Sequence, residues 1–392
     1  MIKYSNKQIK DICSFIGGSQ PPKSEFIHSP KEGYVRLIQI RDRLNDKFIT
    51  YIPEKSTTKF CEYDDILIGR YGPPIFQIFR GFKGAYNVAI MKAEPINNVD
   101  KDYLYYFLLQ PDILKYVESM SARTAGQTGV ELDSLYEYPV NLPNKITQKK
   151  IASVLKSIDD KISNNNRINS ELESMAKTIY DYWFTQFDFP DENGKPYKSS
   201  GGKMVWNEKL KREIPEGWGA TTIGSILGDY PKTTSILRDD YGLGSKYPII
   251  DQSKDYICGY TDDYDNVLHM NDAIVYGDHT NYTKYVNFDF ARGADGTQII
   301  NSNEPALPNY ILYQQILLLP VIEKGYSRHF KFLKEQYVIV PEFEVSKKYM
   351  DMVEYSLLKT KGIITENQQL ASLRDWLLPM LMNGQVGFEG VE

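Results

Sequence analysis

Cysteine, histidine and long apolar runs are scarce in this sequence of 392 residues, and each shortage excludes a class of protein. Its three cysteines, Cys13, Cys61 and Cys258, lie too far apart for a metal-ligand pair, so a reducing compartment such as the cytoplasm is the simplest setting. The four histidines are scattered and form no metal motif. No run of about 18 apolar residues occurs, so we expect neither a membrane-spanning helix nor a membrane partner. The polar segment Met1–Lys10 lacks the apolar core of a secretion signal.

The sequence also lacks the motifs of several enzyme classes. Neither GxGxxG, GxSxG nor the Asn-Pro-Pro-aromatic tetrad of amino-methyltransferases is present. Residues 242–246 are rich in glycine but lack the GxxxxGK[ST] spacing of a phosphate-binding loop. The acidic residues of 190–195 are adjacent and lie in a connector, where a solvated turn is their ordinary role. We therefore expect no catalytic residue and no metal or cofactor site, and a self-contained nuclease is a disfavoured alternative.

The most regular feature of the sequence is a heptad seam, which begins at Ile151. Apolar residues or asparagine recur at alternating steps of four and three, at Ile151, Leu155, Ile158, Ile162, Asn165, Asn169, Leu172, Ala176, Ile179 and Trp183. Polar residues fill nearly all other positions, so the pattern predicts one helix about 50 Å long. Such a helix needs a partner to bury its seam, and we expect this partner at Tyr349–Leu381. Thr147 is the expected N-cap of the first helix, and Asn383-Gly384 is the expected stop of the second.

The two halves of the chain resemble one unit used twice. Residues 63–69 align with residues 270–276 at an offset of 207. The offset falls along the chain, from 214 (Tyr4 with Trp218) through 207 (Tyr103 with Tyr310) to 198 (Asn169 with Asn367). Each match is weak, and their shared order is what supports a duplication. Two such units would most naturally pair about a pseudo-two-fold axis, with antiparallel helices between globular domains that touch two places a fixed distance apart.

These patterns predict an α+β fold in which two similar mixed α/β domains are separated by two long antiparallel coiled-coil helices. The predicted segments are 1–145 (first domain), 146–186 (first long helix), 187–217 (irregular connector), 218–345 (second domain) and 346–392 (C-terminal long helix). Tyr86–Met91 and Val286–Phe290 are among the strands that we expect in these domains, and the second alternates like a half-buried strand.

Binding features are better represented than catalytic ones, although the net charge of −5 argues weakly against a nucleic-acid partner. Basic, polar and aromatic residues recur in loops at matching places of both halves, as contact with phosphates and base edges requires. The candidate DNA-binding residues of the first domain are Arg36, Arg41, Arg43, Lys47, Arg70, Tyr71, Arg80, Lys83, Arg123 and Gln127. Those of the second domain are Lys232, Arg238, Lys246, Lys254, His279, Tyr282, Lys284, Arg328, His329 and Lys331. For any single residue, an ordinary solvated surface is the alternative, and the recurrence in both halves favours binding.

Matching places are predicted for two of these loops. His279, Tyr282 and Lys284 are expected in the loop equivalent to Arg70-Tyr71. The segment with Arg328, His329 and Lys331 is expected at the position of Arg123.

Three stretches of the chain resemble the specificity (S) subunit of type I restriction–modification systems, the HsdS family. Leu142–Ile162 is similar to the central conserved region of that family, Phe187–Trp218 to its inter-repeat connector, and Leu373–Val386 to the end of its C-terminal helix. The resemblance extends over the whole chain in architecture. The N-terminus departs from the family pattern, because Tyr4 stands where an Ile-Pro-x-Gly-Trp start would place tryptophan.

The resemblance implies a non-catalytic DNA-binding subunit that serves restriction, DNA methylation and phage defence. Each domain would be a target recognition domain that reads one half of a bipartite site in double-stranded DNA. The helices would set the gap between the halves and dock two methyltransferase (M) subunits, and motor–nuclease (R) subunits would join them. S-adenosylmethionine, ATP and magnesium would be bound by those partners rather than by this chain. The alternative from another class is a coiled-coil scaffold or oligomerisation protein without sequence-specific DNA contact.

Overall fold

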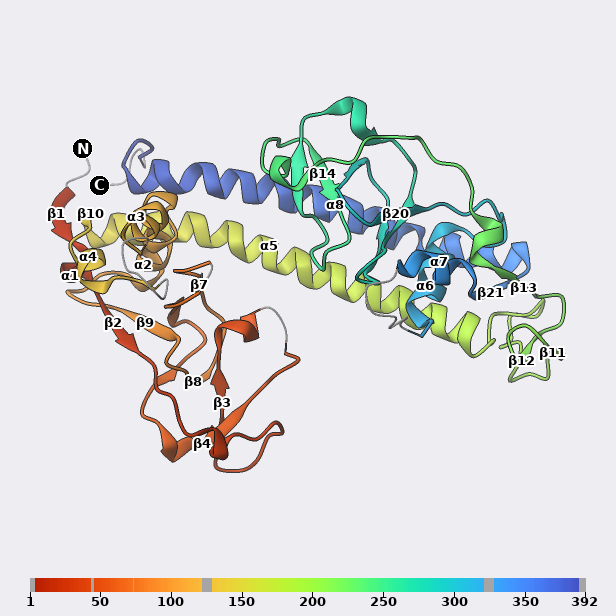
Figure 1. Cartoon of the computed structure of the whole chain (residues 1–392), viewed down its shortest axis with the longest axis horizontal. Helices are drawn as coiled ribbons and strands as arrows, with labels where there is room; N and C mark the ends of the chain where they lie inside the picture. Colours follow the sequence, from red (N-terminus) through yellow and green to blue (C-terminus); the bar gives the residue numbers. More distant parts are fainter. Residues whose placement is uncertain (1–3, 44–45, 73, 122–128, 321–327, 388–392) are drawn as a thin grey trace. The chain divides into compact units, whose positions relative to one another are not determined.

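The computed structural model describes residues 4–43, 46–72, 74–121, 129–320 and 328–387. The chain divides into two compact units, one of which contains the residues up to 163 together with those from 367, and the other residues 164–366. Both boundaries fall inside the long helices α5 (Lys145–Tyr180) and α8 (Phe343–Met382), drawn in yellow-green and blue in Figure 1. Below, these are the first and second units, and each is described by itself. No described helix is both long and apolar enough to cross a bilayer.

Helix α5 follows the predicted seam. All ten seam residues from Ile151 to Trp183 are buried or half-buried, as the heptad pattern predicted. The helix begins at Lys145, and the side-chain oxygen of Asn144 accepts a hydrogen bond from the Thr147 amide at 2.9 Å. Asn144 is therefore the cap, and the assignment of this role to Thr147 was wrong because Thr147 already lies within the first turn. A π-type turn at Asp181–Thr185 follows the helix.

In the second unit, the two long helices run antiparallel. The Asn165 side chain donates to Glu366 at 2.7 Å, and the Tyr349 hydroxyl donates to the Ala176 carbonyl at 3.1 Å. The later residue of α5, Ala176, thus contacts the earlier residue of α8, Tyr349, as antiparallel pairing requires. Asn165 is almost fully buried, and its pairing with a charged partner suits a polar seam position that fixes register.

In the first unit, the other halves of the same helices share one core. Ile151 and Leu155 of α5 join Leu378, Leu381 and Met382 of α8 in a single hydrophobic cluster. Helix α8 ends at Met382, and Gly384 adopts a φ of 69° just beyond it, as predicted for its stop. The helix begins at Phe343, earlier than expected.

The described residues of the first globular region, within 4–143, form one strand pair, two four-stranded sheets and four short α-helices, besides short 3-10 turns. β1 (Tyr4–Gln8) pairs with β10 (Pro139–Pro143). One sheet has the order β2 (Cys13–Gly17), β9 (Ile90–Pro95), β6 (Ile66–Gly69) and β7 (Ile78–Phe79). The other has the order β4 (Tyr51–Pro53), β3 (Tyr34–Ile38), β8 (Gly84–Tyr86) and β5 (Phe60–Cys61). The helices are α1 (Ile9–Ile12), α2 (Lys101–Leu108), α3 (Pro111–Ser121) and α4 (Leu132–Tyr136).

The described residues of the second globular region, within 219–340, form a similar set with one strand fewer in one sheet and fewer α-helices. β13 (Gly219–Thr222) pairs with β21 (Tyr337–Val340). One sheet has the order β18 (Thr283–Val286), β17 (Ala273–Gly277) and β20 (Thr297–Ile300). The other has the order β15 (Gly259–Thr261), β14 (Tyr247–Ile250), β19 (Phe290–Arg292) and β16 (Val267–Leu268). Its helices are α6 (Asn309–Leu318) and α7 (His329–Lys334). The preceding connector holds a hairpin, β11 (Met204–Asn207) with β12 (Arg212–Pro215), which the sequence pattern did not predict.

The two regions repeat the same strand connections, which confirms the predicted internal repeat. β3 pairs parallel with β8 and β14 with β19, and β8 and β19 each take an antiparallel neighbour as well. Single backbone bonds also recur, such as Asn87 to Ile38 (3.1 Å) and Gly293 to Ile250 (2.9 Å). Gly69 lies opposite Ile90 and Gly277 lies opposite Thr297. At this point the structural offset is 208, one residue more than the sequence alignment gave.

Two expected strands are interrupted. Between β8 and β9, the backbone and side-chain oxygens of Asn87 accept hydrogen bonds from Ile90 (3.0 Å) and Ala89 (3.2 Å). The asparagine therefore closes a turn inside the run Tyr86–Met91, which was predicted as one strand. In Val286–Phe290 the burial alternates as predicted, but β18 ends at Val286 and β19 begins at Phe290.

Candidate nucleic-acid interface

The loop that follows β6 is held by backbone hydrogen bonds, with Tyr71 exposed and Arg70 half-buried. We call Gly69, Arg70 and Tyr71 the first tip. The Arg70 amide donates to Ala89 at 2.8 Å, and the Arg70 carbonyl accepts from Val130 at 3.0 Å. The Arg70 guanidinium lies 5.3 Å from the centroid of the Tyr71 ring, and its Nε has no hydrogen-bond partner. A fixed backbone with an arginine stacked on an exposed tyrosine suits contact with nucleic acid.

A second basic loop lies beside the first tip. A Cβ placed on Gly69 would lie 3.3 Å from the Ile40 side chain, so the loop after β3 approaches the tip closely. That loop carries exposed cations at Arg41, Arg43 and Lys47. The Arg41 guanidinium and the Lys47 ammonium lie 5.3 and 5.6 Å from the ring centroid of Phe48. The fold therefore gathers several sequence-predicted candidates of the first region on neighbouring loops.

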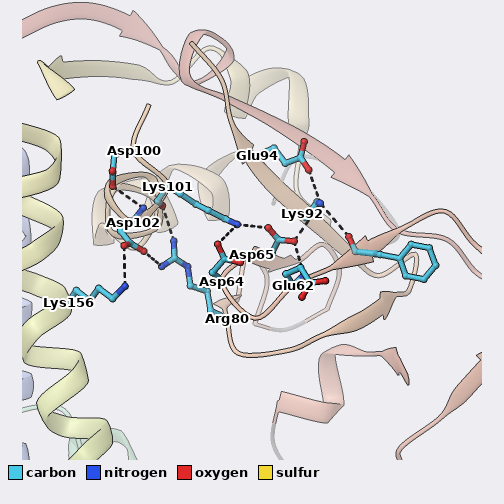
Figure 2. A network of polar contacts seen from close by, with 11 residues as sticks. Glu62, Asp64, Asp65, Arg80, Lys92, Glu94, Asp100, Lys101, Asp102 and Lys156 are labelled. Atoms are coloured by element: carbon cyan, nitrogen blue, oxygen red, sulfur yellow. Dashed lines mark hydrogen bonds and ion pairs between the residues drawn. The ribbon is translucent and has the colours of Figure 1, made fainter. Parts of the chain in front are cut away.

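Arg80 belongs instead to an ion network that fastens the first region to α5 (Figure 2). Its guanidinium pairs with Asp102 at 2.6 Å and donates to the Lys101 carbonyl at 2.8 Å. Asp102 also pairs with Lys156 of α5 at 3.3 Å. Burial, the largest single influence, raises the pKa of Asp102, but the hydrogen bonds and positive charges of Arg80 and Lys156 together outweigh it and hold this pKa below its usual value. We call Arg80, Asp102 and Lys156 the ionic joint.

Two more candidates of the first region are engaged by acids. Lys83 pairs with Glu62 at 2.9 Å, and Arg36 pairs with Asp46 at 2.7 Å. Each would have to give up a protein carboxylate before it could contact a phosphate. Beside Arg80 and Asp102, Lys101 pairs with Asp64 and Asp65 at 2.9 and 2.6 Å (Figure 2). The hydrogen bond from Lys101 lowers the pKa of Asp64.

The loop after β17 has the same backbone frame and different side chains. We call Gly277, Asp278 and His279 the second tip. The Asp278 amide donates to Gly296 at 2.7 Å, and its carbonyl accepts from His329 at 2.8 Å. These bonds correspond to those of Arg70. The Asp278 side chain is buried and accepts from the Phe330 amide at 2.8 Å, whereas His279 and the nearby Tyr282 are exposed.

Two candidates of the second region face the interior. Lys284 lies on β18 rather than in a loop and is 6% exposed, and its ammonium donates to the carbonyls of Asp251 (2.8 Å) and Asp255. Burial lowers the pKa of Lys284. His329 is 5% exposed at the start of α7, and neither ring nitrogen has a hydrogen-bond partner. Neither side chain is presented to a ligand on the surface. The backbone bond to the second tip makes His329 the equivalent of Val130, and its predicted counterpart Arg123 lies outside the described residues.

The remaining candidates are either exposed or lie outside the described residues. The exposed ones in the second region are Lys232, Arg238, Lys246, Lys254, Arg328 and Lys331. Arg123 and Gln127 lie outside the described residues. Within the described part of the chain, no three His, Cys, Asp or Glu side chains gather in a way that could hold a metal ion.

A groove in the first region brings together residues that the sequence did not single out. It is lined by Gln20, Pro21, Pro22, Lys23, Phe26, His28, Gln39 and Arg41. Of these, Arg41 alone was a candidate. The others come from a proline-containing loop and from the end of β3, and no local motif links two segments so far apart in the sequence.

Comparison with known proteins identifies relatives over the whole length. A family model described as the type I restriction modification DNA specificity domain matches residues 1–174. The type I restriction enzyme MjaIX specificity subunit of Methanocaldococcus jannaschii is 26% identical over 419 aligned positions, which cover 98% of this chain and 93% of that protein. The HindI specificity subunit of Haemophilus influenzae is 32% identical over 100 residues, 25% of this chain and 22% of that one. Among solved structures, the type I S subunit from M. genitalium is similar with a TM-score of 0.54 and 17% identity, covering 97% and 96% of the two chains. The last likeness shows that the two chains share a fold.

Proposed function

We infer that this chain, a specificity subunit of a type I restriction–modification system, reads a bipartite DNA site with its two globular regions. The chain recognises DNA sequence and is not itself catalytic. The observation that carries the bipartite reading is the repeated frame. Arg70 and Asp278 have matching backbone bonds, but their side chains differ in charge. The exposed side chains also differ, with Tyr71 at the first tip and His279 at the second, so one frame used twice is suited to reading two unlike half-sites.

In this proposal the long helices set the gap between the half-sites. Antiparallel pairing, seen between α5 and α8 in the second unit through Asn165 and Tyr349, resists changes of length in a way that a flexible linker does not. DNA half-sites lie at intervals set by the helical repeat, about 34 Å per turn, so a rigid spacer translates directly into a fixed number of unspecified base pairs.

The partners complete the complex. Two M subunits would dock on the helices and bring S-adenosylmethionine, and R subunits would bring ATP and magnesium. The net charge of −5 supports this division, because a lone acidic chain gains little from counterion release on DNA. We therefore expect weak DNA binding by the isolated chain and tight binding by its complex with M subunits.

The direct test of the half-site assignment is an exchange of residues 1–145 with those of a relative that recognises another sequence. Methylated adenines would then be mapped in DNA treated with the reconstituted complex. The expected result is a change in one half-site while the other stays the same. A change in both halves would contradict the assignment. Exchange of the connector residues 188–202 is the matched control and should leave both halves unchanged.

The spacer role has its own test. Insertion of seven residues into both α5 and α8, which preserves the heptad seam, lengthens the helices by about 10 Å. That corresponds to about three base pairs of DNA. Mapping of the methylated sites should show a longer gap between unchanged half-sites, and an unchanged gap would show that the helices do not set it.

A further inference from the structure

The groove of the first region is positively charged and contains no acidic lining residue. Its cationic groups are Lys23 and Arg41, and its neutral polar groups are Gln20, Gln39 and His28. Pro21, Pro22 and Phe26 supply the apolar part of its wall. Cations beside amides and apolar surface match the phosphates, base edges and base faces of a nucleic-acid strand.

The cations of the groove are not held by carboxylates of the described residues. Lys23 and Arg41 form no ion pair with any described residue, whereas Arg36, Arg80 and Lys83 of the same region each pair with a carboxylate at 2.9 Å or less. An exposed cation without a carboxylate can meet a phosphate without first breaking a bond.

The amide of Gln39 is oriented by the protein. Its Nε2 donates to the Thr50 hydroxyl at 3.2 Å, and that hydroxyl donates to the Phe48 carbonyl at 3.3 Å. Thr50 is buried, so this chain of bonds fixes which end of the amide faces the protein. The Gln39 oxygen and its second N–H then remain for a ligand. An oriented glutamine with one donor and one acceptor can make the bidentate contact that distinguishes adenine.

The groove adjoins the first tip. Gln39 and Arg41 flank Ile40, and it is the Ile40 side chain that approaches Gly69. Contacts in the groove and contacts at Arg70 and Tyr71 would therefore belong to one continuous surface of the first region.

The second region carries different residues at the equivalent place. The matching backbone bonds equate Ile38 with Ile250, so Gln39 corresponds to Asp251 and Arg41 to Ser253. Asp251 is buried and accepts from the Ser253 amide at 2.8 Å. Any effect of the groove should therefore appear in one half-site alone.

We propose that this groove binds one strand of the DNA half-site read by the first region, with Lys23 and Arg41 on phosphates and with Gln39 and Gln20 on base edges. The proposal rests on the proposed function and adds to it the residues that determine one half of the specificity.

The test uses the chain assembled with its M subunits and a duplex library randomised at both half-sites. Gln39→Ala should reduce discrimination at one base pair of one half-site by about 5- to 150-fold, the usual value of a bidentate base contact. Gln20→Ala is the second variant, because Gln20 is exposed and its side-chain amide donates, at 3.5 Å, to the carbonyl of the neighbouring Pro21. It should weaken discrimination in the same half-site without affecting folding.

The cations are tested by the salt dependence of binding. Lys23→Ala should weaken binding to all sequences alike and reduce the slope of log affinity against log salt by about 1. Lys115→Ala is the matched control, because Lys115 is an exposed lysine of α3 whose nearest acid, Asp112, is 3.9 Å away. It should leave both the slope and the half-site preference unchanged.

Two results would overturn the proposal. One is that Gln39→Ala, Gln20→Ala and Lys23→Ala all behave like Lys115→Ala while exchange of residues 1–145 still changes one half-site, in which case the groove is not the reading surface and the proposed function stands. The other is that inorganic phosphate alone protects Lys23 from amine labelling as well as duplex DNA does, which would make the groove an anion site. If the exchange of residues 1–145 also had no effect, the proposed function itself would fail.

Discussion

The two globular regions share one frame, and each shares an apolar core with the long helices, but the further contacts that fasten them differ. In the first region, the ionic joint links Arg80 and Asp102 to Lys156, and a second link runs from Tyr106 through Asp159 (2.7 Å) to Arg374 (2.9 Å). In the second region, aromatic rings perform the same task. Strand pairing thus preserves the frame, while ion pairs in the first region and packed aromatic rings in the second add to the apolar core that each region shares with the helices.

The attachment of the second region is centred on Tyr349, which has no exposed surface. Its ring meets Phe184 edge-on at 5.1 Å, lies 6.0 Å from Trp183, and stacks on Tyr310 of α6 at 6.4 Å. We call these four residues the aromatic joint. Non-directional burial of this kind tolerates salt and acid, whereas the partly exposed charges of the ionic joint do not. The difference predicts that the two regions respond unequally to the same perturbation.

The largest effect is expected from Tyr349→Ala. Loss of a fully buried aromatic side chain should lower the free energy of unfolding of the second unit by about 3–5 kcal/mol. Urea unfolding, followed by amide hydrogen exchange in α6, would measure the loss. Tyr355→Ala is the control on the same helix, because Tyr355 is 73% exposed and should change stability by less than about 0.5 kcal/mol. Equal effects of the two variants would show that the aromatic joint does not hold the region.

A smaller loss is expected from Arg80→Ala. The variant removes the 2.6 Å ion pair with Asp102 and the 2.8 Å bond to Lys101, which together should cost about 1–3 kcal/mol. Faster hydrogen exchange in α2 would report the loss. Lys83→Ala removes an ion pair whose two side chains are both more than half exposed, and it should cost less than about 1 kcal/mol. If the order of the two variants were reversed, the ionic joint would not be the attachment.

The sequence predicted the parts of this comparison that depend on periodicity. The heptad seam predicted α5 because it repeats at a fixed spacing, and the shared order of weak matches predicted the duplicated frame and the partner helix. The difference between the joints was not predictable, since Arg80, Asp102 and Lys156 are brought together only by the fold.

The candidate site was predictable only where a residue lies next to a clear strand pattern. Arg70 and Tyr71 follow a clear strand, so their place in a loop could be inferred. Lys284 was misplaced because basic residues usually lie at surfaces, and no sequence signal shows that its ammonium bonds to the backbone carbonyls of Asp251 and Asp255. The groove residue Gln39 was missed because its role depends on Thr50 and on a loop that ends near Lys23.

A still smaller effect is expected from salt, to which the two joints should respond differently. Higher ionic strength screens the partly exposed charges of Arg80, Asp102 and Lys156, whereas it does not weaken the apolar contacts of Tyr349. Between low salt and about 1 M sodium chloride, amide exchange should accelerate in α2 relative to α6, by less than about tenfold because part-exposed pairs contribute about 1 kcal/mol. Equal changes in both helices would contradict the distinction.

Acid should give the smallest difference. The folded-state pKa of Asp102 is lowered, so its contribution to stability is present above the unfolded value of about 3.9 and is lost as the pH falls through the folded pKa. The first region should therefore loosen below about pH 4, before the aromatic joint does. Asp102→Asn should reduce the acid response of α2 in hydrogen exchange. An unchanged response would assign it to other carboxylates such as Asp64.

The central claim is that the two regions read two separate half-sites. It is tested most directly by sequencing the duplexes that the complex with M subunits retains from a fully random library. The account predicts two short specified blocks of different sequence at a constant separation. A single specified block, or retention without any sequence preference, would contradict it.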